Sequence, residues 1–262
     1  MVDPYLLHSI ESFPPLNESI NKFNLECSKE HPDYNKISAI IEADPILYTD
    51  ILRFANAPMY GLRNPVTSIR QAISLFSLQR IRGMALSAAI KANPFSDLHP
   101  YGLSVPTWFG IMERQQRFLS EWIIRIDRSL FLQLGAVIFI LEIGRLAASY
   151  VLIFSDNPYR FTKISPFELV LEERNIIGAS GDELAAMLFE SWSFHPSLID
   201  FIRFSLSPEL SASPKIAAML TCARLLFPCC GASDFASAEE IISQYGYDRN
   251  LLFSIYETII KD

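Results

Sequence analysis

The sequence contains few cysteines, and none of them lies in a pattern that would hold a metal ion. The 262 residues include four, with no C-x-x-C pair among them: Cys27, Cys222, Cys229 and Cys230. Such a set does not form a disulfide framework and is typical of buried thiols in a reducing compartment. The N-terminal segment also lacks the basic start and the continuous apolar core of a secretion signal. We therefore expect a cytoplasmic protein.

Sequence motifs for nucleotide binding and hydrolysis are missing as well. The chain has no G-x-x-x-x-G-K-[ST], G-x-G-x-x-G, H-E-x-x-H or G-x-S-x-G. Its histidines are far apart, and three of the four precede a proline, so no two have ligand spacing on one helix: His8, His31, His99 and His195. The residues by themselves predict neither a cofactor nor a metal ion.

Alternating apolar and polar residues bounded by hairpin dipeptides are absent, whereas helix starts are frequent. Asp44-Pro45 predicts an N-cap followed by a first-turn proline. Three segments predict capping boxes, beginning at Ser165, Ser180 and Ser237. We expect an all-α protein with roughly a dozen helices. The loop NPFSDLHPYGLSVP divides it into a helical subdomain at 1–105 and a helical bundle at 106–262.

One charge stands inside an apolar run. Glu142 lies in GAVIFILEIGRLAAS, and a lone buried carboxylate costs several kcal/mol unless it is paired or neutral. The segment Leu134 to Phe154 is long enough to span a bilayer. Glu142 and Arg145 would each cost about 3 kcal/mol at the bilayer centre, but they can pair across one helical turn. We expect a buried core helix with this pair, and no membrane partner.

Charge is distributed unevenly. Residues 51–96 contain no acidic residue but six basic ones, whereas residues 1–50 contain three lysines and nine acids. An arginine-rich face suits carboxylate or phosphate groups, so the candidate residues for anion or partner binding are Arg53, Arg63, Arg70, Arg80 and Arg82. Alternatively, these arginines pair with the acids of the first fifty residues. Neither a recognition helix nor interleaved exposed aromatics support nucleic acid as the partner.

The segment from Asp44 to Ser87 resembles the HDOD family, the HD-related output domains of bacterial signalling proteins. The resemblance rests on D-P, L-x-x-A-N, Y-G, T-S-I and A-I elements, whose key residues here are Asp44, Pro45, Asn56, Tyr60 and Gly61. FPPL at 13–16 and LFESWSFHPSLIDFIRFS also resemble family segments. Read from the residues alone, Asn56 to Gly61 is a helix stop that leads into a corner.

The resemblance implies that the second half is similar to an HD-type phosphohydrolase, in which His and Asp residues hold metals that activate water. Leu141 and Glu142 stand where the family's His-Asp pair would be. The other ligand positions fall at Gly110–Ile111, near Gly181, at Phe204–Ser205–Leu206 and at Ala223–Arg224. Glu142 is the one carboxylate left at these positions.

This pattern implies a catalytically inactive regulator that binds a partner protein in a signalling pathway, with a nucleotide as the other candidate ligand. Glu142 would then be a structural remnant. The alternatives are a divergent metal-dependent phosphohydrolase or phosphodiesterase with a non-standard site, and a sensor that holds a small anion between the two subdomains.

Overall fold

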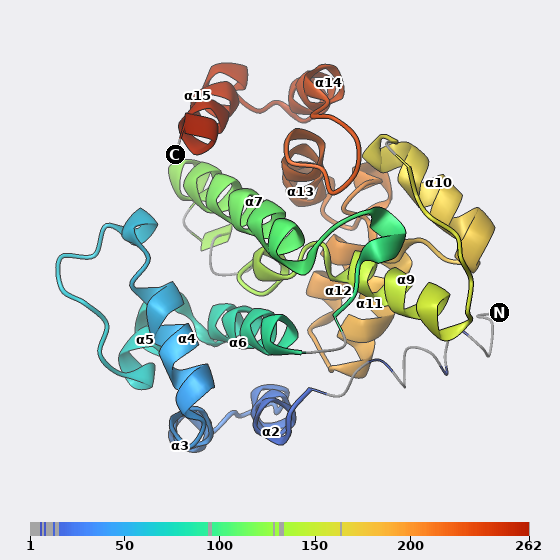
Figure 1. The fold of residues 1–262 in the computed structure, drawn as a ribbon. Coiled ribbons are helices and arrows are strands. Elements are labelled where there is room, and N and C mark those ends of the chain that lie inside the picture. The colour runs from blue at the N-terminus through green and yellow to red at the C-terminus, as the bar shows by residue number, and fades with distance from the viewer. Residues whose placement is uncertain are drawn as a thin grey trace. The chain divides into compact units, whose positions relative to one another are not determined.

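The computed structural model describes residues 6, 8, 13, 16–93, 96–127, 129–130, 134–162 and 164–261. These residues form thirteen α-helices and four short 3-10 helices, and none of them lies in a strand (Figure 1). An isolated bridge joins Leu98 and Leu103. The all-α prediction is confirmed.

The chain forms two compact units. The N-terminal unit comprises residues 14–95 and 123–140, and the C-terminal unit comprises 1–13, 96–122 and 141–262. The change of unit at 95/96 falls inside the loop that the sequence marks as a boundary. A single division at 105/106 does not predict that 123–140 returns to the N-terminal unit. It returns because apolar residues such as Val137 and Ile138 are fully buried there.

The N-terminal unit consists of short helices. They are α2 (Glu18–Cys27), α3 (Tyr34–Glu42), α4 (Pro45–Ala55), η1 (Pro58–Tyr60), α5 (Ile69–Phe76), α6 (Leu78–Ala92) and η3 (Val137–Phe139). The segment around η3 packs closely on α6. A Cβ on Gly83 would lie 2.7 Å from the Ala136 Cα, and a Cβ on Gly135 would lie 2.8 Å from the Arg80 Cβ.

The corner that follows α4 in the N-terminal unit is built as its residues predict. Asp44 caps α4 by accepting hydrogen bonds from the backbone of Ile46 and Leu47. The Asn56 side chain accepts from the Val66 N–H and donates to the Val66 and Leu52 carbonyls, which ties the end of α4 to the next segment. Gly61 adopts φ +55°, the left-handed region that glycine tolerates best.

The C-terminal unit holds the remaining helices. They are η2 (His99–Tyr101), α7 (Val105–Ile126, the last turn of which belongs to the N-terminal unit), α9 (Ile143–Phe154), α10 (Pro166–Ile177), α11 (Gly181–Ser191), α12 (Pro196–Arg203), η4 (Pro208–Leu210), α13 (Pro214–Leu226), α14 (Phe235–Tyr245) and α15 (Arg249–Lys261). The capping boxes at Ser165 and Ser180 are confirmed. The one at Ser237 is wrong, because α14 begins two residues earlier and Asp234 caps it.

The apolar segment Leu134 to Phe154 is buried over most of its length, but it is not one helix. It contains η3, a turn at 140–142 and then α9. The break falls at Glu142, the residue before α9. Two glycines and several β-branched residues lower the helix propensity of this stretch. In the part of the chain that the structure describes, no helix is both long and apolar enough to cross a bilayer.

Candidate functional site

Glu142 lies at the centre of a buried polar cluster in the C-terminal unit. Its Oε1 accepts hydrogen bonds from Gln115 Nε2 at 2.9 Å and Arg224 Nε at 3.0 Å. Its Oε2 accepts one from Arg224 Nη2 at 3.1 Å, and Arg145 Nε lies 3.5 Å away. The predicted partner Arg145 is therefore present, but the closer partners are Gln115, 27 positions before it, and Arg224, 82 positions after it.

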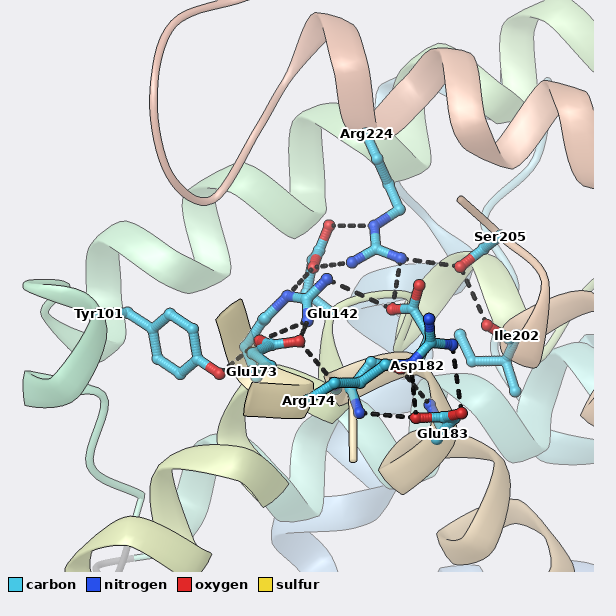
Figure 2. Close-up of polar contacts among 12 residues, drawn as sticks. Tyr101, Glu142, Glu173, Arg174, Asp182, Glu183, Ile202, Ser205 and Arg224 are labelled. Atoms are coloured by element: carbon cyan, nitrogen blue, oxygen red, sulfur yellow. Dashed lines mark hydrogen bonds and ion pairs between the residues drawn. The ribbon is translucent and has the colours of Figure 1, made fainter. Parts of the chain in front are cut away.

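Arg224 contributes its whole guanidinium to the cluster. Besides the two bonds to Glu142, its Nη1 donates to Asp182 Oδ1 at 2.6 Å and to Ser205 Oγ at 2.8 Å. Figure 2 shows the guanidinium between Glu142 and Asp182, with Ser205 beside it. This arginine on α13 thus joins the start of α9 to the first turn of α11.

Arg145 forms the second half of the cluster. Its Nη1 lies 2.6 Å from both carboxylate oxygens of Glu173, and its Nη2 lies 3.3 Å from Asp182 Oδ1. Glu173 also accepts hydrogen bonds from the Tyr101 hydroxyl and the Gly181 N–H, both at 2.6 Å. Three carboxylates and two guanidiniums are therefore buried together, and each carboxylate accepts hydrogen bonds from at least one guanidinium.

The cluster sets the acidity of its members. Burial acts to raise the pKa of Glu142, but the positive charges of Arg224 and Arg145 and the Gln115 hydrogen bond hold that pKa below its ordinary value. Burial also acts to lower the pKa of Arg145, yet Glu173, Asp182 and Glu142 raise it well above its usual range. Burial prevails at Glu173, whose pKa is raised. Glu142 and Arg145 thus form a charged pair.

A small cavity of about 10 Å³ adjoins the cluster, with room for about one water molecule. The residues that line it include Glu142, Arg145, Arg224, Cys229 and Cys230. Burial raises the pKa of the Cys230 thiol to about 11 and that of Cys229 well above its ordinary value. The two thiols are therefore protonated at neutral pH and are poor metal ligands or nucleophiles.

The cluster does not fit a divalent metal. Metal centres in HD-type proteins need several His and Asp ligands with free lone pairs. Here the oxygens of Glu142 already accept hydrogen bonds from Gln115 and Arg224, and two buried guanidiniums place positive charge at the centre. Among the described residues, no group of three or more His, Cys, Asp or Glu side chains could hold a metal ion.

The sequence positions at which the resemblance places metal ligands do converge. Glu142, the first turn of α11, Ser205 and Arg224 meet in one cluster, while Leu141 is buried next to Glu142. The upstream position is shifted, since Gln115 makes the contact rather than Gly110 or Ile111. Sequence reasoning missed Gln115, Glu173 and Asp182 as members. The sequence signal for Asp182 and Glu173 was that each is an acidic residue in a helix with an apolar face.

The five candidate arginines of residues 51–96, a segment called the basic window below, do not form one surface. Arg53, Arg63 and Arg70 are exposed, whereas Arg80 and Arg82 are almost fully buried. Arg80 Nη2 donates to Tyr60 Oη at 3.2 Å, and its guanidinium lies over the rings of Tyr60 and Phe139.

Arg82 donates to the Asn24 and Ser28 side chains at 2.8 and 3.1 Å. Burial lowers its pKa to about 10. Neither Arg80 nor Arg82 can belong to an exposed anion-binding face, because their guanidiniums are engaged inside the N-terminal unit. The interpretation that the arginines pair with acids of the first fifty residues holds for Arg53, which lies 2.7 Å from Asp50.

Fold and cluster together define an all-helical protein with a buried ionic cluster in its C-terminal unit. Residues 13–101 match the model of the HDOD domain, and this match confirms the resemblance of the Asp44 to Ser87 segment. No curated protein matches the sequence.

Several solved structures share the fold. A putative phosphohydrolase from Shewanella amazonensis SB2B matches with a TM-score of 0.66 and 21% identity over 98% of this chain and 94% of its own. An HDOD domain protein from Geobacter sulfurreducens matches with a TM-score of 0.63 and 16% identity over 97% and 95%. A putative signal transduction protein from Marinobacter aquaeolei VT8 matches with a TM-score of 0.65 and 20% identity over 100% and 59%. At these identities the similarity shows the fold alone.

Proposed function

We propose that this protein is a non-enzymatic regulator in a bacterial signalling pathway that acts by binding a protein partner or a small anionic ligand. The observation that carries the proposal is the Arg224 guanidinium between Glu142 and Asp182. In an HD-type enzyme a metal must take up substrate oxygen and activate water. A guanidinium donates hydrogen bonds and cannot coordinate, so this cluster supports no such chemistry.

The signalling context is supported by the HDOD match and by the likeness to the signal transduction protein from Marinobacter aquaeolei VT8. Binding is supported by the exposed arginines of the N-terminal unit. Arg63 lies in the loop from Gly61 to Pro65, of which every residue is exposed, and Arg70 is exposed on α5. Exposed guanidiniums recognise carboxylate and phosphate groups in bidentate geometry. An acidic protein surface is therefore the partner that this unit favours.

Hydrolysis assays test the absence of catalysis. The full-length protein is assayed with bis(p-nitrophenyl) phosphate in the presence of Mn²⁺, Mg²⁺ or Zn²⁺, beside Glu142→Gln. The proposal expects no metal-dependent turnover by either protein. Metal-dependent hydrolysis by the wild type that Glu142→Gln abolishes would instead establish a divergent phosphohydrolase.

Affinity capture from the protein's own cells, at low and high salt, tests binding. The triple variant Arg53→Glu, Arg63→Glu, Arg70→Glu should lose a stoichiometric partner that the wild type retains at low salt. The control is Arg114→Glu, Arg160→Glu, Lys215→Glu, which makes the same charge change at exposed positions of the C-terminal unit. If both variants retain the partner equally, the arginine surface is not the binding site.

A further inference from the structure

We infer that the Arg224 guanidinium takes the place of a divalent cation in the buried cluster, so that removing it converts Glu142, Asp182 and Ser205 into a site for a hard cation such as Mn²⁺. The inference does not depend on the proposed regulatory function, because it concerns what holds this cluster together.

The contacts of Arg224 are those of a bridging cation. It lies within 3.1 Å of three carboxylate oxygens and one hydroxyl oxygen, which come from the start of α9, the first turn of α11 and the segment after α12. All four of these oxygen atoms, which belong to three side chains, can offer lone pairs. Carboxylate and hydroxyl oxygens are the donors that Mg²⁺, Ca²⁺ and Mn²⁺ prefer.

Charge in the cluster makes the replacement of one cation by another favourable. The cluster contains three carboxylates and two guanidiniums, and all five side chains are nearly or fully buried. Without Arg224, Glu142 and Asp182 would share only Arg145, and buried carboxylates without a positive partner are strongly disfavoured. A divalent cation would restore the missing charge and exceed it by one unit.

Two features offer space and additional ligands. The cavity of about 10 Å³ is lined by both Glu142 and Arg224, so shortening Arg224 would enlarge a space that already exists. Gln115 Oε1 is buried and has no hydrogen-bond partner in the structure, although its Nε2 makes two bonds. This amide oxygen is an unused acceptor on the side chain whose Nε2 contacts Glu142. Water molecules can complete the coordination, as is usual for Mg²⁺.

The experiment compares the full-length wild type with Arg224→Ala. Mn²⁺ binding is measured by electron paramagnetic resonance of the free ion, and thermal stability by circular dichroism with Mn²⁺ or with EDTA. We expect one Mn²⁺ per chain for Arg224→Ala and none for the wild type. At a hundredfold excess over Kd, Mn²⁺ should raise the Tm of the variant by about 5 °C or more and leave the wild type unchanged.

Two further variants keep the test decisive. Glu142→Gln, Arg224→Ala removes one carboxylate and should abolish Mn²⁺ binding, whereas Glu113→Gln, Arg224→Ala changes an exposed glutamate on α7 and should bind like Arg224→Ala. If Arg224→Ala does not fold in EDTA, refolding with Mn²⁺ should restore its helical spectrum. Stoichiometric Mn²⁺ binding by the wild type, or no binding or refolding of Arg224→Ala with Mn²⁺, would overturn the inference.

Discussion

At the scale of single residues, Glu142 shows how a buried charge is made tolerable. Its carboxylate would cost several kcal/mol alone, but it accepts hydrogen bonds from Gln115 and Arg224 and lies near Arg145. Removing one partner of a buried ion pair destabilises a protein more than replacing both partners by apolar side chains, because the remaining charge stays buried without compensation. Glu142 is for this reason the side chain whose loss should be most visible in pH-dependent stability.

We predict that Glu142→Gln lowers the free energy of unfolding at pH 7 by about 3–5 kcal/mol. The folded pKa of Glu142 lies below its ordinary value of 4.5, so its contribution is fully present above that pH and is lost as pH falls through the folded pKa. The variant should therefore lose less stability than the wild type between pH 5 and pH 3. Urea unfolding at pH 7, 5, 4 and 3 measures both effects.

Two comparisons control this experiment. Glu113→Gln, exposed on α7, should leave the pH profile unchanged. Glu173 should act in the opposite direction, because burial raises its pKa and its ionisation weakens the fold as pH rises above 4.5. An identical loss of stability on acidification in Glu142→Gln and wild type would show that Glu142 is not ionised in the folded protein.

At the scale of helices, the cluster exists because α9 and α11 approach each other closely. A Cβ on Gly144, in the first turn of α9, would lie 1.9 Å from the Gly181 carbonyl oxygen at the start of α11. A Cβ on Gly181 would lie 2.2 Å from Arg145 Nη1. Glycine at both positions thus lets the two helix starts touch, and this contact brings Arg145 beside Glu173 and Asp182.

We predict that Gly144→Ala destabilises the protein by about 3 kcal/mol or more, because its methyl group would collide with backbone rather than with a movable side chain. Gly110→Ala is the matched control, since no atom lies within 4 Å of its added Cβ in the middle of α7. Alanine there should be neutral or stabilise by up to about 1 kcal/mol through helix propensity. Equal unfolding free energies for the two variants would contradict the close approach.

At the scale of the whole molecule, the HDOD match and the compact units do not coincide. The match covers 13–101, whereas the N-terminal unit takes its last piece from 123–140. This returning segment buries Val137, Ile138 and Phe139 and packs its glycine and alanine against Gly83 and Arg80 of α6. The unit is therefore discontinuous in sequence, and its core is incomplete without the returning segment.

We predict that a fragment of residues 14–95 does not fold cooperatively, because α6 then exposes the surface that 135–139 covers. Co-expression with residues 123–140 fused to a soluble carrier should recover a complex with a sigmoidal urea transition. Gly83→Leu in the fragment should prevent that recovery, since its side chain would fill the place of Ala136. A cooperative transition for 14–95 alone would show that the returning segment is dispensable.

Much of the fold follows from the sequence by itself, because its signals act over a few residues. Asp44-Pro45, Ser165 and Ser180 begin helices where predicted, since an N-cap bonds to amides only two or three positions away. The same locality explains the error at Ser237, where Asp234 is an equally local and competing cap. The pairing of Glu142 with Arg145 was predictable for the same reason, as the two are one helical turn apart.

Only the tertiary structure decided which residues form the buried cluster and which arginines of the basic window are exposed. Glu142 meets Gln115 and Arg224 because α7 and α13 bring them together across 27 and 82 positions, distances over which sequence spacing carries no geometric information. Arg80 and Arg82 looked like Arg63 and Arg70 in the sequence, since charge alone does not show which side of α6 is buried. Local bonding determines where helices begin, whereas burial, which depends on distant segments, determines what each charge can do.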